Sequence, residues 1–143
     1  MISVSSKDPE KGALGKGKKA LLFLGHGSRA ADANDGMYRT MGLVKEMTGY
    51  EIVEAGFMDL NAPSIPEGAA ACVAQGATMV LMIPYFLHLG RHVQRDLPNT
   101  VRELKQRYPG VEIVLGRHIG FHPKLAEIIV ERVHEMDGDG GEP

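Results

Sequence analysis

The sequence is short of cysteine and of long apolar runs, and each shortage excludes a class of protein. A single cysteine, Cys72, rules out an intramolecular disulfide and any CxxC metal or redox site. No apolar run approaches the ~20 residues that a membrane-spanning helix needs. The apolar stretch nearest the N-terminus, residues 20–24, is too short for a signal peptide. We therefore expect a cytoplasmic protein with no membrane partner.

The sequence also lacks an excess of positive charge and a set of aromatic side chains for stacking on bases. Its net charge is −2, it contains no Trp, and Phe and Tyr number four each. Nucleic-acid-binding proteins usually carry a basic face, so we expect no nucleic-acid partner. The remaining composition is ordinary for a globular protein, with 143 residues of which 43% are hydrophobic and 24% charged. A chain of this length can bury a proper core as one domain.

Polar, glycine-rich segments flank the part of the chain that we expect to fold. We interpret residues 1–18 as a flexible extension and residues 137–143 as a flexible acidic tail, which leaves a single domain over residues 19–136. The extension nearly matches the phosphate loop G-x-x-x-x-G-K-[ST] from Gly12 to Lys19. The final Ser or Thr is missing and no strand precedes it, so we expect the extension to be dispensable and ATP to play no part.

Short apolar segments that are typical of strands alternate with segments of helical spacing. Ser64, followed by Glu67, predicts a capping box at the start of one helix, and Asp96 is the expected N-cap of the next, with Pro98 in its first turn. Strand–helix alternation of this kind predicts an α/β fold, a doubly wound domain with a four-stranded parallel sheet and helices on both faces. Strands are predicted at residues 20–24, 51–57, 78–83 and 111–115, and helices at residues 33–47, 64–74, 95–108 and 123–136.

Histidines gather where the predicted strands end, which is the edge of a parallel sheet where ligands bind. His26 lies between two glycines, which allow a ligand to approach the backbone closely. His134 is expected on the surface of the last helix, and Cys72 in the core. The histidines that follow strand ends are His26, His88, His92, His118 and His122.

Two histidine pairs have the four-residue spacing of a zinc pair on a helix. They are His88 with His92 and His118 with His122, but a glycine interrupts each pair and disfavours a regular helix. A closed structural zinc site takes four ligands, and without further cysteines this chain would need several distant histidines. A structural zinc site is therefore disfavoured.

Three motifs identify a family. They are Gly25-His26-Gly27-Ser28-Arg29, the segment FMDLNAPSIPE at residues 57–67, and the segment IPYFLHLGRHVQRDLP at residues 83–98. Together they resemble the small CbiX-type sirohydrochlorin cobaltochelatases, which belong to the class II tetrapyrrole chelatases, and the resemblance extends over residues 20–136. It implies a chelatase-like fold and a lyase-type reaction, the insertion of a divalent metal, most of all Co²⁺, into sirohydrochlorin without ATP, in cobalamin biosynthesis. A nickel or iron chelatase, or a non-catalytic carrier of metal or tetrapyrrole, remains an alternative.

The resemblance implies that His26 and His92 are the catalytic and metal-binding residues. His88 lies outside the shared pattern, and Asp59 stands where the family often has Glu. Neutral imidazole is a good ligand for Co²⁺, Ni²⁺ and Fe²⁺, and it can accept a pyrrole proton near neutral pH.

The implied substrate is a polycarboxylate, so we expect donors near these histidines to bind its rim. The candidates are Ser28, Arg29, Arg91, Arg95 and Arg117, together with the glycine N–H groups of the first motif. The resemblance implies no permanent cofactor, since the metal ion is a substrate. Larger members of the family carry two such domains in one chain, so we expect this shorter chain to form a homodimer.

Overall fold

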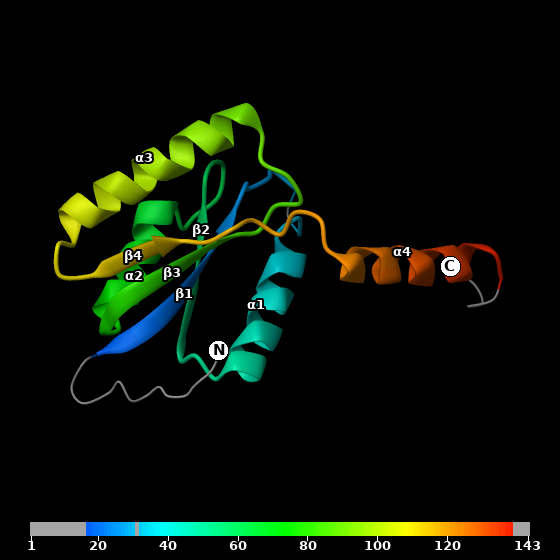
Figure 1. Ribbon diagram of the computed structural model, residues 1–143, viewed down its shortest axis with the longest axis horizontal. Coiled ribbons are helices and arrows are strands. Elements are labelled where there is room, and N and C mark those ends of the chain that lie inside the picture. The colour runs from blue at the N-terminus through cyan, green and yellow to red at the C-terminus, as the bar shows by residue number, and fades with distance from the viewer. Residues whose placement is uncertain (1–16, 31, 139–143) are drawn as a thin grey trace.

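Four parallel strands form the centre of the fold in the computed structural model, which describes residues 17–30 and 32–138 (Figure 1). In chain order the strands are β1 (Lys18–Gly25), β2 (Ile52–Phe57), β3 (Ala77–Pro84) and β4 (Glu112–Leu115). They are arranged in the order β2-β1-β3-β4. This arrangement confirms the predicted α/β fold and its four-stranded parallel sheet. Most of the predicted extension and tail lies outside the described residues.

Helices lie on both faces of the sheet, as expected, but they are divided unequally. α1 (Asp35–Thr48) lies on one face, whereas α2 (Ile65–Ala74) and α3 (Arg91–Arg107) cover the other (Figure 1). α4 (Pro123–Met136) matches its predicted bounds, yet it extends away from the sheet instead of covering it. Consecutive residues of β1 face opposite sides of the sheet, and helices cover both sides. This explains why the predicted strand is apolar throughout. Leu21 and Phe23 pack toward α1, Leu22 and Leu24 pack toward α2 and α3, and all four are at most 6% exposed.

The prediction for α3 is wrong at its start. The helix begins at Arg91, with Gly90 at the N-cap, so Asp96 is not the N-cap and Pro98 lies inside the helix. A stripe of buried apolar residues explains the longer helix. Its members follow one another at helical spacing and pack in the main core; they are Val93, Leu97, Val101 and Leu104. Burial of Val93, the first of them, offsets the free-energy cost of a proline inside the helix.

α2 begins with the predicted capping box. The Oγ atom of Ser64 accepts a hydrogen bond from the N–H of Glu67 at 3.2 Å, and the Oε1 atom of Glu67 accepts one from the N–H of Ser64 at 2.8 Å. These two bonds satisfy donors that the first turn of a helix would otherwise leave open.

Replacing Ser64 by Ala is expected to lower the free energy of unfolding by about 1 kcal/mol, because the acceptor for the Glu67 N–H is lost. Urea denaturation followed by circular dichroism measures the change. Ser64→Asp is the control, since it retains an acceptor and should stay close to wild type. An equal loss in both variants would contradict the capping role.

The single cysteine and the last histidine occupy the places expected for them. Cys72 is fully buried in α2, and burial, with a smaller effect of Glu54, raises the pKa of its thiol to about 12. A thiol held protonated in this way is unreactive. His134 is exposed on α4. Among the helices of residues 17–30 and 32–138, none combines the length and apolar character required to cross a bilayer.

Candidate active site at the carboxyl edge of the sheet

The four strands run in one direction, so their carboxyl ends meet at a single edge of the sheet. His26 follows β1 directly, His88 lies in the segment after β3, and His118 follows β4. His92 is in the first turn of α3, and His122 is the N-cap of α4. As the sequence predicts, all five histidines follow the carboxyl ends of strands, after β1, β3 and β4.

The loop that carries His26 is fastened to the loop after β2. The N–H of Met58 donates to the carbonyl of Gly25 at 2.9 Å, and the N–H of Asp59 donates to the carbonyl of His26 at 3.1 Å. Gly27 has a φ of +93°, and a Cβ atom there would collide with the carbonyl oxygen of Asp59. Only glycine fits this position without strain, and the close approach fixes the backbone of His26.

The imidazole of His26 packs against Phe86, a residue that the sequence analysis did not single out. The two ring centroids are 4.5 Å apart and the ring planes are tilted by 53°. Phe86 is 5% exposed, whereas His26 is exposed, so the ring is supported on one side and open to solvent on the other. The carbonyl of Phe86 also accepts a hydrogen bond from the N–H of Gly120 at 3.4 Å. Phe86 thus connects His26 with the segment between β4 and α4.

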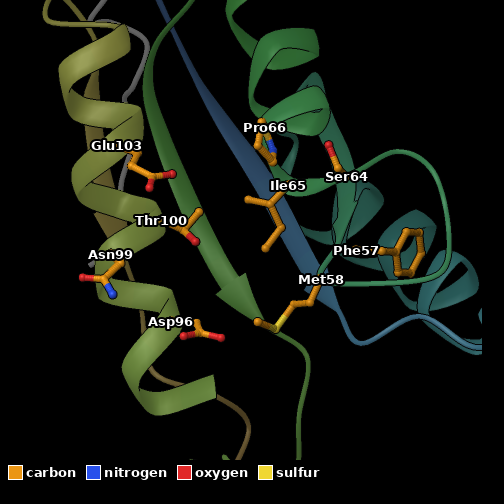
Figure 2. A pocket seen from close by; sticks show the side chains of 9 residues that line it. All are labelled: Phe57, Met58, Ser64, Ile65, Pro66, Asp96, Asn99, Thr100 and Glu103. Carbon is orange, nitrogen blue, oxygen red and sulfur yellow. The ribbon is translucent and has the colours of Figure 1, made fainter. Parts of the chain in front are cut away.

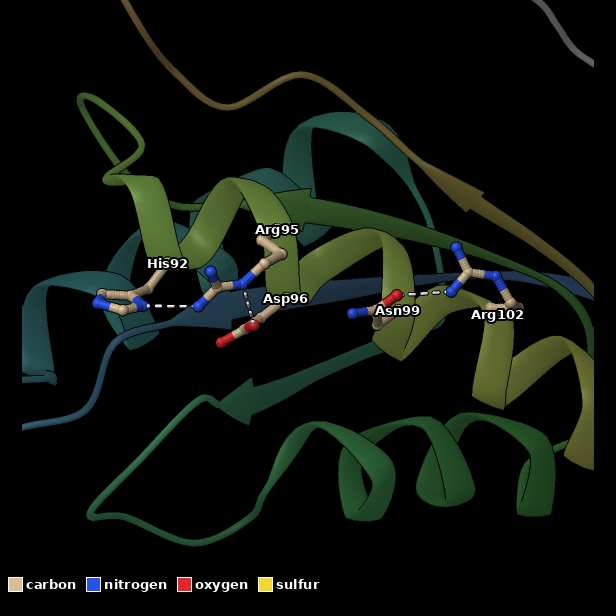
Figure 3. A network of polar contacts seen from close by, with 5 residues as sticks. All are labelled: His92, Arg95, Asp96, Asn99 and Arg102. Atoms are coloured by element: carbon tan, nitrogen blue, oxygen red, sulfur yellow. Dashed lines mark hydrogen bonds and ion pairs between the residues drawn. The ribbon is translucent and has the colours of Figure 1, made fainter.

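His92 is held by an arginine on the next turn of its own helix (Figure 3). The Nη2 atom of Arg95 lies 2.9 Å from the Nδ1 atom of His92. A guanidinium group can only donate, so Nδ1 is the acceptor and the neutral imidazole carries its proton on Nε2. The Nε atom of Arg95 is also 3.7 Å from the Oδ1 atom of Asp96. In this arrangement the one lone pair of the imidazole is occupied, and a metal ion can bind His92 only when Arg95 turns away.

The other predicted substrate-binding residues differ in exposure and in how many of their hydrogen-bonding groups are already in use. Arg29 and Arg91 are exposed, the first in the His26 loop and the second at the start of α3. The N–H of Ser28 already donates to the Oδ1 atom of Asn61, while its Oγ atom accepts from the N–H of Ala30 at 3.1 Å. The hydroxyl proton of Ser28 is therefore the donor this residue can offer a ligand. Asn61, which fastens the two loops, was not singled out by the sequence analysis.

The remaining polar side chains of this edge have local roles. The Oδ1 atom of Asp59 accepts from the N–H of Leu60 at 2.8 Å. The Nδ1 atom of His122 accepts from the N–H of Lys124 at 3.1 Å and so caps α4. Within the part of the chain that the structure describes, no three His, Cys, Asp or Glu side chains are grouped so that they could hold a metal ion.

A groove of about 400 Å³ lies between the start of α2 and one face of α3 (Figure 2). Asp96 and Glu103 are the charged residues that line it, and both are acidic. An acidic groove repels a polycarboxylate, so a substrate of that kind is better accommodated by the arginine-bearing loops at the sheet edge. The lining residues are Phe57, Met58, Ser64, Ile65, Pro66, Asp96, Asn99, Thr100 and Glu103.

Comparison with known proteins finds a similar fold in a sirohydrochlorin chelatase. The sirohydrochlorin chelatase SirB from Bacillus subtilis subspecies spizizenii, whose crystal structure is a complex with cobalt, matches 83% of this chain and 51% of its own with a TM-score of 0.77 and 30% identity. A model of the CbiX family matches residues 20–136. The chain belongs to the CbiX family, as its motifs indicate.

Two curated relatives differ in the metal that their names give. The sirohydrochlorin cobaltochelatase of Priestia megaterium is 40% identical over 121 residues, which are 84% of this chain and 39% of the relative. A sirohydrochlorin ferrochelatase of the same organism is 32% identical over 120 residues, which are 84% of this chain and 45% of the relative. The chain thus spans half or less of the length of these two relatives.

Proposed function

We propose that the protein inserts Co²⁺ into sirohydrochlorin without ATP, as a step of cobalamin biosynthesis. The observation that carries the proposal is the position of His26 and His92 at one edge of the sheet in a chain of the CbiX family. Neither histidine belongs to a closed metal cluster among the described residues. Such ligands suit an ion that must be held briefly and then released.

The reaction requires that the ion lose water ligands and that two pyrrole nitrogens lose their protons. His26, supported by Phe86 and open on its other side, can bind the ion over the ring or accept one pyrrole proton. His92 supplies a second lone pair once Arg95 releases its Nδ1 atom. A carboxylate of the macrocycle is the natural competitor for Arg95, because carboxylates accept from guanidinium groups more strongly than a neutral imidazole does. Binding of the macrocycle then frees His92 for the metal.

Replacing Arg95 by Ala is expected to tighten Co²⁺ binding in the absence of sirohydrochlorin by about two- to tenfold, because a hydrogen bond worth about 0.5–1.5 kcal/mol no longer competes for His92. The KM for sirohydrochlorin should rise in the same variant. Titration calorimetry measures the first effect and steady-state kinetics the second.

Arg102→Ala is the matched control, since it removes the same charge from the same helix. Arg102 donates to the Oδ1 atom of Asn99 at 2.6 Å and does not contact His92 (Figure 3). If Arg102→Ala changed Co²⁺ affinity as much as Arg95→Ala, the change would come from the loss of positive charge and not from the loss of the hydrogen bond to His92.

The choice of cobalt over iron follows the more similar of the two relatives, which is a cobaltochelatase. Imidazole ligands alone select poorly among Co²⁺, Ni²⁺ and Fe²⁺. The test mixes the protein with sirohydrochlorin and each metal in turn, without oxygen, and follows the absorption spectrum against protein-free controls. Co²⁺ should be inserted fastest, over many turnovers, and added ATP should change nothing. Metallation of no more than one macrocycle per protein would indicate a carrier.

A flat macrocycle is best held between two walls, and one domain of this size offers one wall. A homodimer supplies the second wall, and we expect it to be the active form.

A further inference from the structure

Three exposed aliphatic side chains lie in the loops around His26 at the carboxyl edge of the sheet. Leu60 is 54% exposed, Leu87 is 61% exposed and Ile119 is 39% exposed. They come from three different loops, which follow β2, β3 and β4. We call these three residues the aliphatic rim. A single exposed apolar side chain is ordinary, but several of them around one site are typical of a surface that a ligand covers.

Leu60 is held next to the His26 loop by the residues on either side of it. The N–H of Asp59 donates to the carbonyl of His26 at 3.1 Å, and the Oδ1 atom of Asn61 accepts from the N–H of Ser28. The N–H of Leu60 itself donates to the Oδ1 atom of Asp59 at 2.8 Å. The backbone of Leu60 is therefore fixed beside His26, while its side chain remains exposed.

The other two members of the rim are connected to His26 through Phe86. Leu87 follows Phe86, whose ring lies 4.5 Å from the imidazole of His26 between centroids. Ile119 precedes Gly120, whose N–H donates to the carbonyl of Phe86 at 3.4 Å. The strand order β2-β1-β3-β4 thus places Leu60 on one side of His26 and the other two on the opposite side. Adjacent strands lie about 4.8 Å apart, so this edge is about 14 Å wide, on the scale of a flat tetrapyrrole.

Leu60 adopts a backbone conformation that leucine disfavours. Its φ is +69°, in the left-handed region, where glycine and asparagine fit far better. The fold gains little in return, since Leu60 is in neither of the two apolar clusters formed by the described residues. Leucine therefore lowers stability at this position. Strain of this kind is common where a residue contacts a ligand, and burial of the side chain under a ligand offsets it.

We propose that the aliphatic rim binds one face of the tetrapyrrole, while the arginines beside it bind the carboxylates at the margin of the ring. The inference rests on the proposed reaction and deepens it, because it names the residues that contact the ring itself. A flat tetrapyrrole has an apolar face, and the implied substrate carries carboxylates around it. The loops match both features, since Arg29 and Arg117 are exposed on the loops that follow β1 and β4.

The rim also explains how the ring is placed over His26. The imidazole is supported by Phe86 on one side and open to solvent on the other. A ring that rests on side chains from both sides of His26 presents its pyrrole nitrogens to the open side of the imidazole. An ion or proton held by His26 then has a short path to those nitrogens.

Leu60→Asn and Leu60→Gly test the proposal, because they separate stability from binding. Both remove an unfavourable backbone conformation, so the urea midpoint should not fall. Both also remove the apolar contact, so the KM for sirohydrochlorin should rise by about four- to tenfold, as expected when about half of a leucine side chain loses its burial. The kcat should change less than the KM, and Co²⁺ affinity without the macrocycle should not change. Leu60→Met retains an apolar side chain and should keep a KM close to that of wild type.

Leu87→Asn should raise the KM in the same way, and Leu43→Asn is the matched control. Leu43 is 59% exposed but lies in α1, away from the carboxyl edge. The KM ratios should be as large at high ionic strength as at low, because salt screens the arginine contacts and not the apolar ones. An unchanged KM in Leu60→Asn and Leu87→Asn, or an equal rise in Leu43→Asn, overturns the proposal.

Binding of metal-free sirohydrochlorin, measured by absorption titration, distinguishes this inference from the proposed reaction. If the wild type binds the ring but inserts no metal, and Leu60→Asn binds it more weakly, the rim is supported and the reaction is contradicted. If the wild type inserts Co²⁺ and the rim variants bind the ring as tightly as it does, the reaction is supported and the rim is contradicted. Light scattering adds a check, since a change of oligomeric state in Leu60→Asn would assign the rim to a contact between copies and overturn the proposal.

Discussion

Replacing His92 by Ala is expected to lower the rate of metal insertion by on the order of 10²-fold or more, because the proposed reaction uses this side chain both as a ligand and as a proton acceptor. His26→Ala should have an effect of the same size. His88→Ala should stay within about tenfold of wild type, a range below that of a general-base loss. The three histidines occupy the same edge of the sheet, so the difference must come from how each is held.

His92 and His88 differ in their support. His92 is in the first turn of α3, directly before Val93, which is 7% exposed and belongs to the core. That anchor fixes the direction of the His92 side chain. His88 is exposed and lies in the irregular segment between β3 and α3. Its imidazole can meet a metal ion from solvent, and it makes no hydrogen bond or ion pair with the residues that the structure describes.

The comparison uses sirohydrochlorin absorption for the rate and calorimetry for Co²⁺ affinity, with circular dichroism as a check on the fold. His92→Gln provides a variant that retains polarity and approximate size but loses the basic nitrogen, and it should be as slow as His92→Ala. If His88→Ala were inactive and His92→Ala active, the assignment of the third motif to His92 would be wrong.

The sheet was predictable because its strands are marked by apolar runs. Residues 20–24 are apolar on both faces, and a strand covered from both sides requires that pattern. The capping box at Ser64 was predictable for a similar reason, since it depends on two residues three positions apart. The position of the histidines at the carboxyl edge was predictable from the parallel direction of the strands, because parallel strands bring their carboxyl ends together.

The features that were missed depend on contacts between distant residues. α3 starts at Arg91 because Val93 packs in the core. In the sequence alone, Pro98 favours a helix that begins just before it, and no local pattern indicates the earlier start. The support of His26 by Phe86 joins two residues that are 60 positions apart, 86 − 26. The direction of α4 is set by hydrogen bonds of its connection, so its 3.6-residue period predicted the helix and not its place.

Replacing Gly27 by Ala is expected to lower the free energy of unfolding by at least about 2 kcal/mol, since an alanine at positive φ is itself strained. The added Cβ would also collide with the carbonyl oxygen of Asp59, so one of the two loops must move. Either movement disturbs the hydrogen bonds from Met58 and Asp59 that fix the His26 backbone. Because a displacement of about 1 Å can cost on the order of 10²-fold in rate, metal insertion should fall by a similar factor.

Urea denaturation and the sirohydrochlorin assay separate these two effects. Gly42→Ala is the control, because Gly42 lies in α1 with nothing within 4 Å of the added atom. That variant should be more stable by up to about 1 kcal/mol, as a helical glycine is costly, and fully active. If Gly27→Ala lost stability but kept its rate, the strained loop would relax without moving His26. His26 would then be positioned by its packing on Phe86, not by the hydrogen bonds between the first two loops.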